Sequence, residues 1–189
     1  MPDHQAEYVD LPIYHDQLAG ALGFSPSDLQ ANQSGRLTDS QRTMQFGQIS
    51  RAIVMSAVFL ALAIGCLVLA FAIGVTTGLG LLLVLLAGCF TAFLALIVWV
   101  NIPFARDLRA GVVSSIEGLV QPAERETRIR TGPGTGVPIW SYSWVVDGAQ
   151  RFAVSGRTFA VLTPARHRLY FLPLSRRIVA AKPISTMTN

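Results

Sequence analysis

Charged residues are scarce in this sequence. Asp, Glu, Lys and Arg make up 14% of its 189 residues, against about 25% in a typical soluble domain. This shortage excludes a disordered tail, a coiled coil and a nucleic-acid-binding arm. The chain also has only two cysteines, which excludes a small secreted scaffold held together by disulfides. Its length allows one or two small domains.

Sequence motifs of catalysis are absent as well. No HExxH, GxSxG, CxxC or phosphate-loop pattern occurs, and we interpret the glycine-rich stretch 132–136 as a flexible hairpin tip. His167 has no identifiable partner that would orient it for catalysis, so we expect it at the surface or at a sheet edge, between Arg166 and Arg168. We therefore expect no catalytic residue and no cofactor, and an enzyme of unknown type stays an alternative.

The missing charge is confined to one segment. No Asp, Glu, Lys or Arg occurs from residue 52 to residue 105. Two apolar runs, 52–74 and 79–101, occupy this segment, with a turn of four residues over 75–78. As a helix, each run reaches about 33 Å, enough to cross a bilayer core of about 30 Å. Because a backbone in lipid must satisfy its own hydrogen bonds, we predict two transmembrane helices. A buried hairpin of a soluble protein is the alternative.

Basic residues on both flanks predict the topology. Arg42 and Arg51 precede the first run, Arg106 and Arg109 follow the second, and the turn between the runs has no basic residue. The positive-inside rule then places both termini in the cytoplasm, with the helices in the plasma (inner) membrane. Pro103 is expected to stop the second helix from running on.

Small residues recur along both predicted helices, at a spacing that lets helix backbones approach closely. They are Ala57, Ala61, Gly65, Gly88 and Ala92. We expect them to pack the two helices against each other, and self-association of the protein is the alternative. Neither run contains an ionisable residue of the kind that marks an ion pathway, which argues against an ion-coupled transporter that works alone.

The segment 1–51 has a net charge of −3. Ser25, Pro26 and Asp28 predict the start of a short helix, which Gly35 can end. A capping box over 38–41 predicts a second helix that runs straight into the first membrane span.

His4 and His15 lie among acidic residues near the N-terminus. Their spacing matches no zinc or calcium pattern. We therefore expect no metal there, and a solvated, partly mobile terminus.

The segment 106–189 has a net charge of +7, and its hydrophobic pattern alternates. Trp140, Tyr142, Trp144 and Val146 fall on one face of a strand over 139–146. Further strands are predicted over 111–121, 125–130, 151–154, 168–172 and 177–181, and one helical turn over 156–162. The fold class that we predict is a membrane α-helical hairpin plus a small antiparallel β-barrel or sandwich domain.

Asp147 and Gly148 indicate a hairpin turn. A two-residue loop would put Phe152 on the face opposite to Trp144, because a slip of one residue turns every side chain over. We therefore predict a three-residue loop, 146–148, with Gly148 left-handed, which sets Tyr142 opposite Phe152.

Arginine accounts for fourteen of the fifteen basic residues, a bias that genome composition alone can produce. In a second interpretation, arginines near an anionic leaflet bind lipid headgroups or an acidic partner, with about 1 kcal/mol from each. Binding of single-stranded nucleic acid by stacking is a third, and we do not expect it, because the aromatic residues share the apolar face. The candidate binding residues are Arg106, Arg109, Arg125, Arg128, Arg130, Arg166, Arg168, Arg176 and Arg177.

The stretch 28–41 precedes the two apolar runs, and the sequence Tyr170-Phe171-Leu172-Pro173 lies toward the end of the β-domain. With the two apolar runs, they resemble bacterial two-span membrane proteins of unknown function with a small cytoplasmic β-domain. The layout is also similar to membrane-anchored OB-domain proteins that partner stomatin-like scaffolds. The resemblance implies a fold and a location, and it carries over no functional residue.

These patterns lead to one expected function and one alternative from another class. We expect a membrane-anchored, non-enzymatic binding or accessory module that presents a basic β-domain at the inner leaflet, where its partner is the lipid bilayer or a membrane complex. The alternative is an oligomeric transport or channel component that uses Gly65, Gly88 and Thr91 in helix packing. The opposite charges of the two flanking segments also suggest that the N-terminal segment docks on the β-domain.

Overall fold

The computed structural model describes residues 11–132 and 135–184. The chain divides into two compact units. Arg42–Ala110 forms one, the helical hairpin, and Met1–Gln41 together with Gly111–Asn189 forms the other, the β-unit. Two segments at opposite ends of the sequence therefore fold together.

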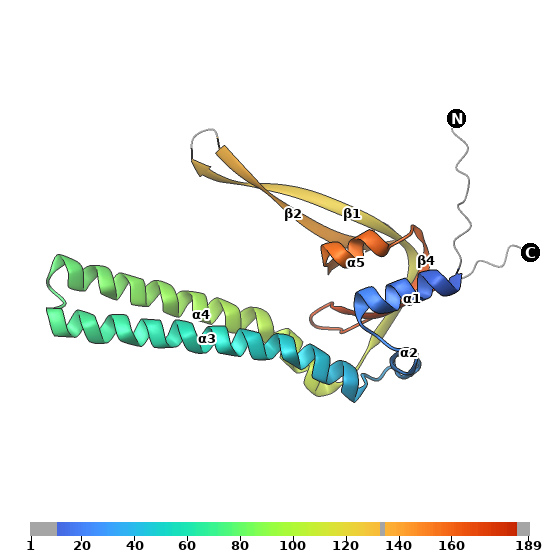
Figure 1. Cartoon of the computed structure of the whole chain (residues 1–189), viewed down its shortest axis with the longest axis horizontal. Coiled ribbons are helices and arrows are strands. Elements are labelled where there is room, and N and C mark those ends of the chain that lie inside the picture. Colours follow the sequence, from blue (N-terminus) through green and yellow to red (C-terminus); the bar gives the residue numbers. More distant parts are fainter. Residues whose placement is uncertain (1–10, 133–134, 185–189) are drawn as a thin grey trace, which may run out of the picture. The chain divides into compact units, whose positions relative to one another are not determined.

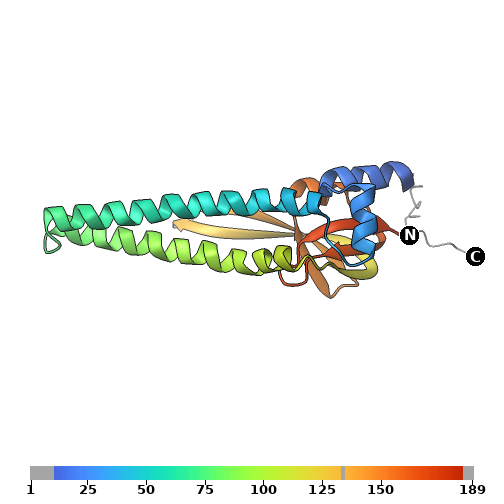
Figure 2. The ribbon, with the colours of Figure 1, turned by 90° about the horizontal axis from the view of Figure 1, so that it is seen from below.

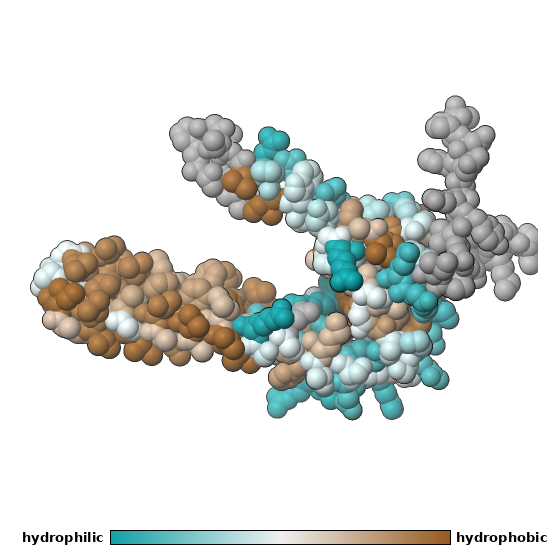
Figure 3. Space-filling view, in the orientation of Figure 1, coloured by the Kyte–Doolittle hydropathy of each residue, from teal (hydrophilic) through white to brown (hydrophobic). Residues whose placement is uncertain are grey.

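The helical hairpin consists of α3 (Asp39–Ile73) and α4 (Gly78–Ala110), which lie antiparallel and side by side (Figures 1 and 2). Both helices are long and apolar enough to cross a membrane, and Figure 3 shows apolar residues along their surface. Helix α3 runs unbroken from its polar start into its apolar run, as predicted. The expected stop at Pro103 is wrong, because α4 accommodates this proline in its interior and continues to Ala110.

The contact between α3 and α4 uses other residues than the predicted ones. Phe59 of α3 packs against Phe90 and Phe93 of α4, and Ala63 and Ala87 are buried. The five small residues predicted to pack the helices together are all exposed: Ala57, Ala61, Gly65, Gly88 and Ala92. Their spacing therefore does not reflect packing within the hairpin, and that interpretation is wrong. The five residues lie on the outer surface of the two helices instead.

Helix α2 (Pro26–Gln33) begins and ends as the sequence predicts. The Ser25 hydroxyl accepts a hydrogen bond from the Asp28 N–H, and the Asp28 carboxylate accepts one from the Ser25 N–H, which completes a capping box. Gly35 follows the helix with φ 77°, the left-handed conformation that glycine adopts without strain. The predicted box before α3 is only half formed: Thr38 accepts from the Gln41 N–H, but the Gln41 side chain donates to the Val179 carbonyl instead.

The β-unit is built on one antiparallel sheet of five strands, in the order β3-β2-β1-β4-β5. The strands are β1 (Ser114–Gly132), β2 (Thr135–Val146), β3 (Gln150–Val154), β4 (Ala165–Phe171) and β5 (Ile178–Pro183), with the short helix α5 (Gly156–Val161) before β4. The segments 111–121 and 125–130, predicted as two strands, fall in the single long β1, except for residues 111–113, which precede it.

The predicted barrel or sandwich is wrong, because this sheet is open. A barrel closes only when its two edge strands pair with each other, and among the described residues the edges β3 and β5 do not. Helix α1 (Leu11–Leu22) packs on the sheet and contributes to its core, where a sandwich would place a second sheet. The open sheet also differs from the closed barrel of an OB-domain.

The turn between β2 and β3 has the predicted length but another position. The loop is Asp147–Ala149, and Gly148 is left-handed with φ 70°, as predicted. Trp144 pairs with Phe152, whereas the predicted loop would place Tyr142 opposite Phe152. The error is two residues, so the facing of every side chain is still as predicted.

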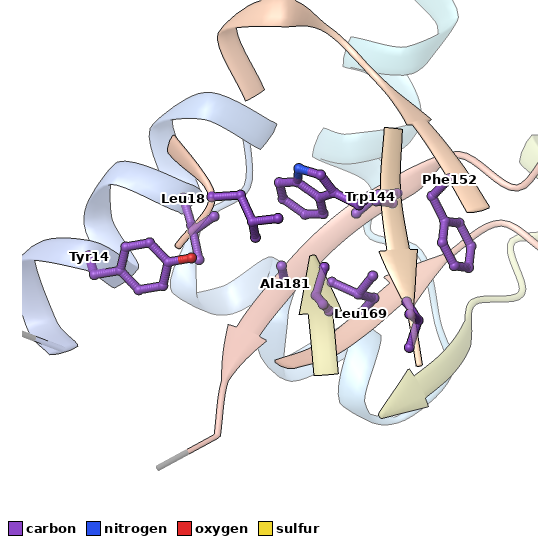
Figure 4. Packing of buried hydrophobic residues seen from close by; sticks show 10 residues of the cluster. Tyr14, Leu18, Trp144, Phe152, Leu169 and Ala181 are labelled. Atoms are coloured by element: carbon purple, nitrogen blue, oxygen red, sulfur yellow. The ribbon is translucent and has the colours of Figure 1, made fainter. Parts of the chain in front are cut away.

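The core of the β-unit lies between the sheet and α1. Trp144 and Leu169 from the sheet are fully buried, together with Leu18 from α1. Figure 4 shows Leu18 pointing toward the Trp144 ring. The expectation of a solvated terminus is therefore wrong for residues 11–22, while docking of the N-terminal segment on the β-unit is confirmed, through apolar contacts.

Candidate functional site

The nine candidate arginines are distributed over both units of the chain. Arg106 and Arg109 belong to α4 of the helical hairpin and are exposed. In the β-unit, three lie on β1, two on β4 and two in the turn between β4 and β5: Arg125, Arg128 and Arg130, then Arg166 and Arg168, then Arg176 and Arg177. Within the β-unit they therefore belong to three different elements.

Two of these arginines have acidic partners on the surface. Arg128 lies 2.7 Å from Glu126 on the same strand, and Arg168 lies 2.7 Å from Glu117 across the β1–β4 pair. Such exposed pairs contribute little to stability, about 0–1 kcal/mol, and in each of them the glutamate offsets the positive charge that the arginine offers to a partner. Arg177 is half-buried, and desolvation lowers its pKa from the ordinary value.

The most exposed part of the β-unit is a two-stranded arm. Strand β1 pairs with β4 only as far as Val120, and β2 pairs with β3 only from Tyr142 onward. Beyond these points β1 and β2 continue as a ribbon of two strands, 121–132 with 135–141, which we call the arm (Figure 1). The pairing reaches Gly132 and Thr135, while Pro133 and Gly134 of the predicted flexible tip lie outside the described residues.

Exposure rises along β2 from the core into the arm. Trp144 is fully buried, Tyr142 is half-buried against the Phe159 ring of α5, and Trp140 is 49% exposed. The three rings share a face, as predicted, but Trp140 lies past the helices that cover the other two. The opposite face of the arm carries Val137, 54% exposed, and Ile139, 46% exposed, and neither is among the predicted site residues.

His167 is the second notable group, and its predicted surface position is wrong. Its side chain is fully buried, because β4 alternates and turns Arg166 and Arg168 outward while His167 faces the core with Leu169. Its Nε2 lies 3.0 Å from the Tyr14 hydroxyl of α1, and its Nδ1 lies 2.9 Å from the Ala165 carbonyl oxygen.

These contacts define the protonation of the histidine. A carbonyl oxygen only accepts, so Nδ1 carries the hydrogen, and in the neutral ring Nε2 accepts from the Tyr14 hydroxyl. The Tyr14 oxygen in turn accepts from the Thr163 N–H at 2.9 Å. Desolvation lowers the pKa of His167 and raises the pKa of Tyr14, so both groups are held neutral. This geometry ties α1 to the sheet and shows no open substrate position.

Asp28 is the centre of a third polar cluster. Its carboxylate accepts hydrogen bonds from the Ser25 N–H, the Ser25 hydroxyl, the Thr38 hydroxyl and the Ser40 hydroxyl. Burial by itself raises the pKa of Asp28, but these hydrogen bonds outweigh it and hold the pKa below its ordinary value. The cluster joins α2 to the first residues of α3, and every oxygen of the carboxylate is occupied by this structural role.

Metal ligands do not gather in the described part of the chain. No group of three or more His, Cys, Asp or Glu side chains lies close enough there to hold a metal ion. His4 and its acidic neighbours lie outside the described residues, while His15 packs edge-on against Phe24.

Comparison with known proteins adds no family to these observations. No protein-family model matches this chain, and no curated protein or solved structure matches it. The resemblance to two-span membrane proteins stays a prediction.

Proposed function

We propose that this protein is a membrane-anchored, non-enzymatic binding or accessory module, which holds the β-unit with its basic segment 111–189 at the inner leaflet of a plasma membrane with both termini in the cytoplasm. The observation that carries the proposal is a junction. Helix α4 ends at Ala110 and β1 begins at Ser114, so three residues join an exposed apolar helix to a folded, polar unit. A β-unit tethered so closely to a bilayer lies within reach of its headgroups, and Arg166 and Arg176 are exposed and available to bind them.

Reconstitution of the full chain tests this proposal. Nanodiscs that contain phosphatidylglycerol, compared with nanodiscs of phosphatidylcholine alone, should slow the hydrogen exchange of the segment 165–177, and high salt should abolish the difference. Arg166→Gln with Arg176→Gln should remove the protection, while Arg151→Gln, an exposed arginine outside the candidate set, should keep it. Equal exchange in both kinds of disc would contradict headgroup binding.

A second candidate is an oligomeric transport or channel component. It is favoured by the outward position of Ala57, Ala61 and Gly65 on α3, because small residues at this spacing suit contact with a further helix. Gly65→Leu should then lower the oligomer mass of the purified protein in detergent. A monomer in the unmodified protein would exclude this candidate.

A further inference from the structure

We propose that the arm of the β-unit inserts its uncharged end into the interfacial layer of the same bilayer that holds the helical hairpin, with the lipid surface as its binding partner. This inference rests on the proposed function, since it requires the β-unit to lie at a membrane.

The first support is the need of the arm for a partner. From Gln121 onward β1 has only β2 beside it, over twelve residues or about 40 Å of strand. Along this ribbon the described side chains are exposed, with the one exception of half-buried Ala123. A two-stranded hairpin without a third strand or a packed helix is marginally stable in water, so a surface that covers its faces would stabilise it.

The second support is the distribution of charge. From Thr131 to Val146 the sequence has no charged residue, and this stretch includes the whole of the arm that β2 contributes. Behind it on β1 stand three arginines of the candidate set, of which Arg125 and Arg128 are exposed. Glu124 and Glu126 alternate with them, so the stretch 124–130 has a net charge of +1. An uncharged end followed by a stretch with a small net positive charge suits a bilayer surface, where apolar residues enter and guanidinium groups such as that of Arg125 reach back to the phosphates.

The third support separates lipid from a protein partner. Cross-strand pairs place Ile139 with Thr127 on one face of the ribbon and Trp140 with Glu126 on the other. Exposed apolar side chains therefore occur on both faces of the arm, and Figure 3 shows apolar residues beside its grey tip. A docked protein covers one face of a thin ribbon, whereas lipid surrounds both.

The prolines of the arm argue against growth of the sheet by a second copy. Pro122 and Pro138 both lie in unbroken register with the opposite strand, so their nitrogens face the outer edges, where a proline has no N–H to offer. The remaining outer N–H and C=O groups still need water or headgroups, because hydrocarbon cannot satisfy them. The arm accordingly belongs in the interface, where tryptophan is enriched, and not in the bilayer core.

Spin labels on the full chain in lipid nanodiscs test the inference. In a background with Cys66→Ala and Cys89→Ala, single cysteines replace Ile139 on the arm, Ala149 in the exposed β2–β3 loop, and Leu69 in the exposed apolar run of α3. The ratio of oxygen to nickel-chelate accessibility distinguishes lipid from water. We expect a ratio at residue 139 several-fold above that at residue 149, and closer to that at residue 69.

Two failures are distinguishable. Residue 69 in lipid with residue 139 in water, or residue 139 shielded from both probes by protein, would overturn the inference and leave the proposed function intact. Residue 69 in water would overturn the proposed function itself. As a second check, Trp140→Asp should move the label at residue 139 into water, whereas Leu174→Asp, which changes an exposed apolar residue outside the arm, should leave it in lipid.

Discussion

Tyr14 Oη lies 3.0 Å from His167 Nε2, although 153 positions separate the two residues in the sequence. The same oxygen accepts a hydrogen bond from the Thr163 N–H. One phenol thereby joins α1 to the sheet and to the segment before β4.

Removal of that hydroxyl should loosen α1. Tyr14→Phe keeps the ring but leaves the Thr163 N–H and the His167 Nε2 without their partner, and an unsatisfied buried polar group costs about 1–3 kcal/mol. Hydrogen exchange of the full chain in detergent should show faster exchange in 14–22 and 163–169. Tyr142→Phe, which removes a hydroxyl from a half-buried ring, is the matched control, and an equal effect of both variants would contradict this role for Tyr14.

Acid should destabilise the β-unit through His167. Burial lowers its pKa in the folded state below the value of about 6.5 in an unfolded chain, so the unfolded state binds the proton first. The free energy of unfolding should be constant above about pH 6.5. Below that pH it should fall by at most about 1.4 kcal/mol per pH unit for one group. The fall should stop at the folded-state pKa of His167.

The test measures the hydrogen exchange of the β4 amides and converts it to a free energy of opening, after correction for the pH dependence of exchange in an unprotected amide. His167→Gln should be less stable at neutral pH, since it loses the ring, and should show a flatter dependence between pH 7 and pH 5. An unchanged slope in this variant would assign the acid effect to another group.

The apolar contact of α1 should matter more than its hydrogen bond. Leu18 is fully buried against the sheet, and a buried Leu→Ala change costs about 2–5 kcal/mol. Leu18→Ala should therefore release α1 to limited proteolysis, and deletion of residues 1–24 should expose the Trp144 face and destabilise the β-unit. Gln17→Ala, at the exposed neighbouring position, should change neither, and a stable β-unit without residues 1–24 would refute the dependence on α1.

Local rules were enough to predict many elements of this fold. The absence of charge over 52–105 predicts the two long helices, and Ser25, Pro26 and Asp28 specify the start of α2 because capping is decided within four residues. The alternation in β2 predicts which side chains share a face. All of these features depend on residues that are close to one another in the sequence.

Other features depend on partners that are distant in sequence. Whether the sheet closes is decided by pairing between β3 and β5, and whether Trp140 is covered is decided by how far α1 and α5 extend over β2. His167 and α1 were missed although a local signal existed: Tyr14, Leu18 and Leu22 recur every four residues, a helical stripe, and His167 alternates with Arg166 and Arg168 as the buried member of a strand.

Loss of the Asp28 carboxylate should loosen the joint between α2 and the start of α3. Asp28→Asn cannot accept all four of the hydrogen bonds that this carboxylate receives, and a hydrogen bond to a charged group contributes about 1.5–3 kcal/mol. Faster exchange of 26–41 is expected, and Asp16→Asn in exposed α1 sequence is the control. Because the folded pKa is lowered, this stabilisation is present above the unfolded value near 3.9 and is lost as the pH falls through the folded pKa.

The turn of the helical hairpin should tolerate no side chain at Gly80. A Cβ built there would collide with the carbonyl oxygen of Gly74, whereas a Cβ at Gly78 would meet nothing within 4 Å. Gly74 itself has φ 101° and ends α3, so the turn cannot shift without strain at a position that favours glycine. Gly80→Ala should therefore lower the temperature at which the detergent-solubilised full chain aggregates, and Gly78→Ala should raise it slightly or leave it unchanged, because alanine favours a helix start over glycine. Equal aggregation temperatures for the two variants would mean that α3 and α4 separate at this end with little loss of free energy.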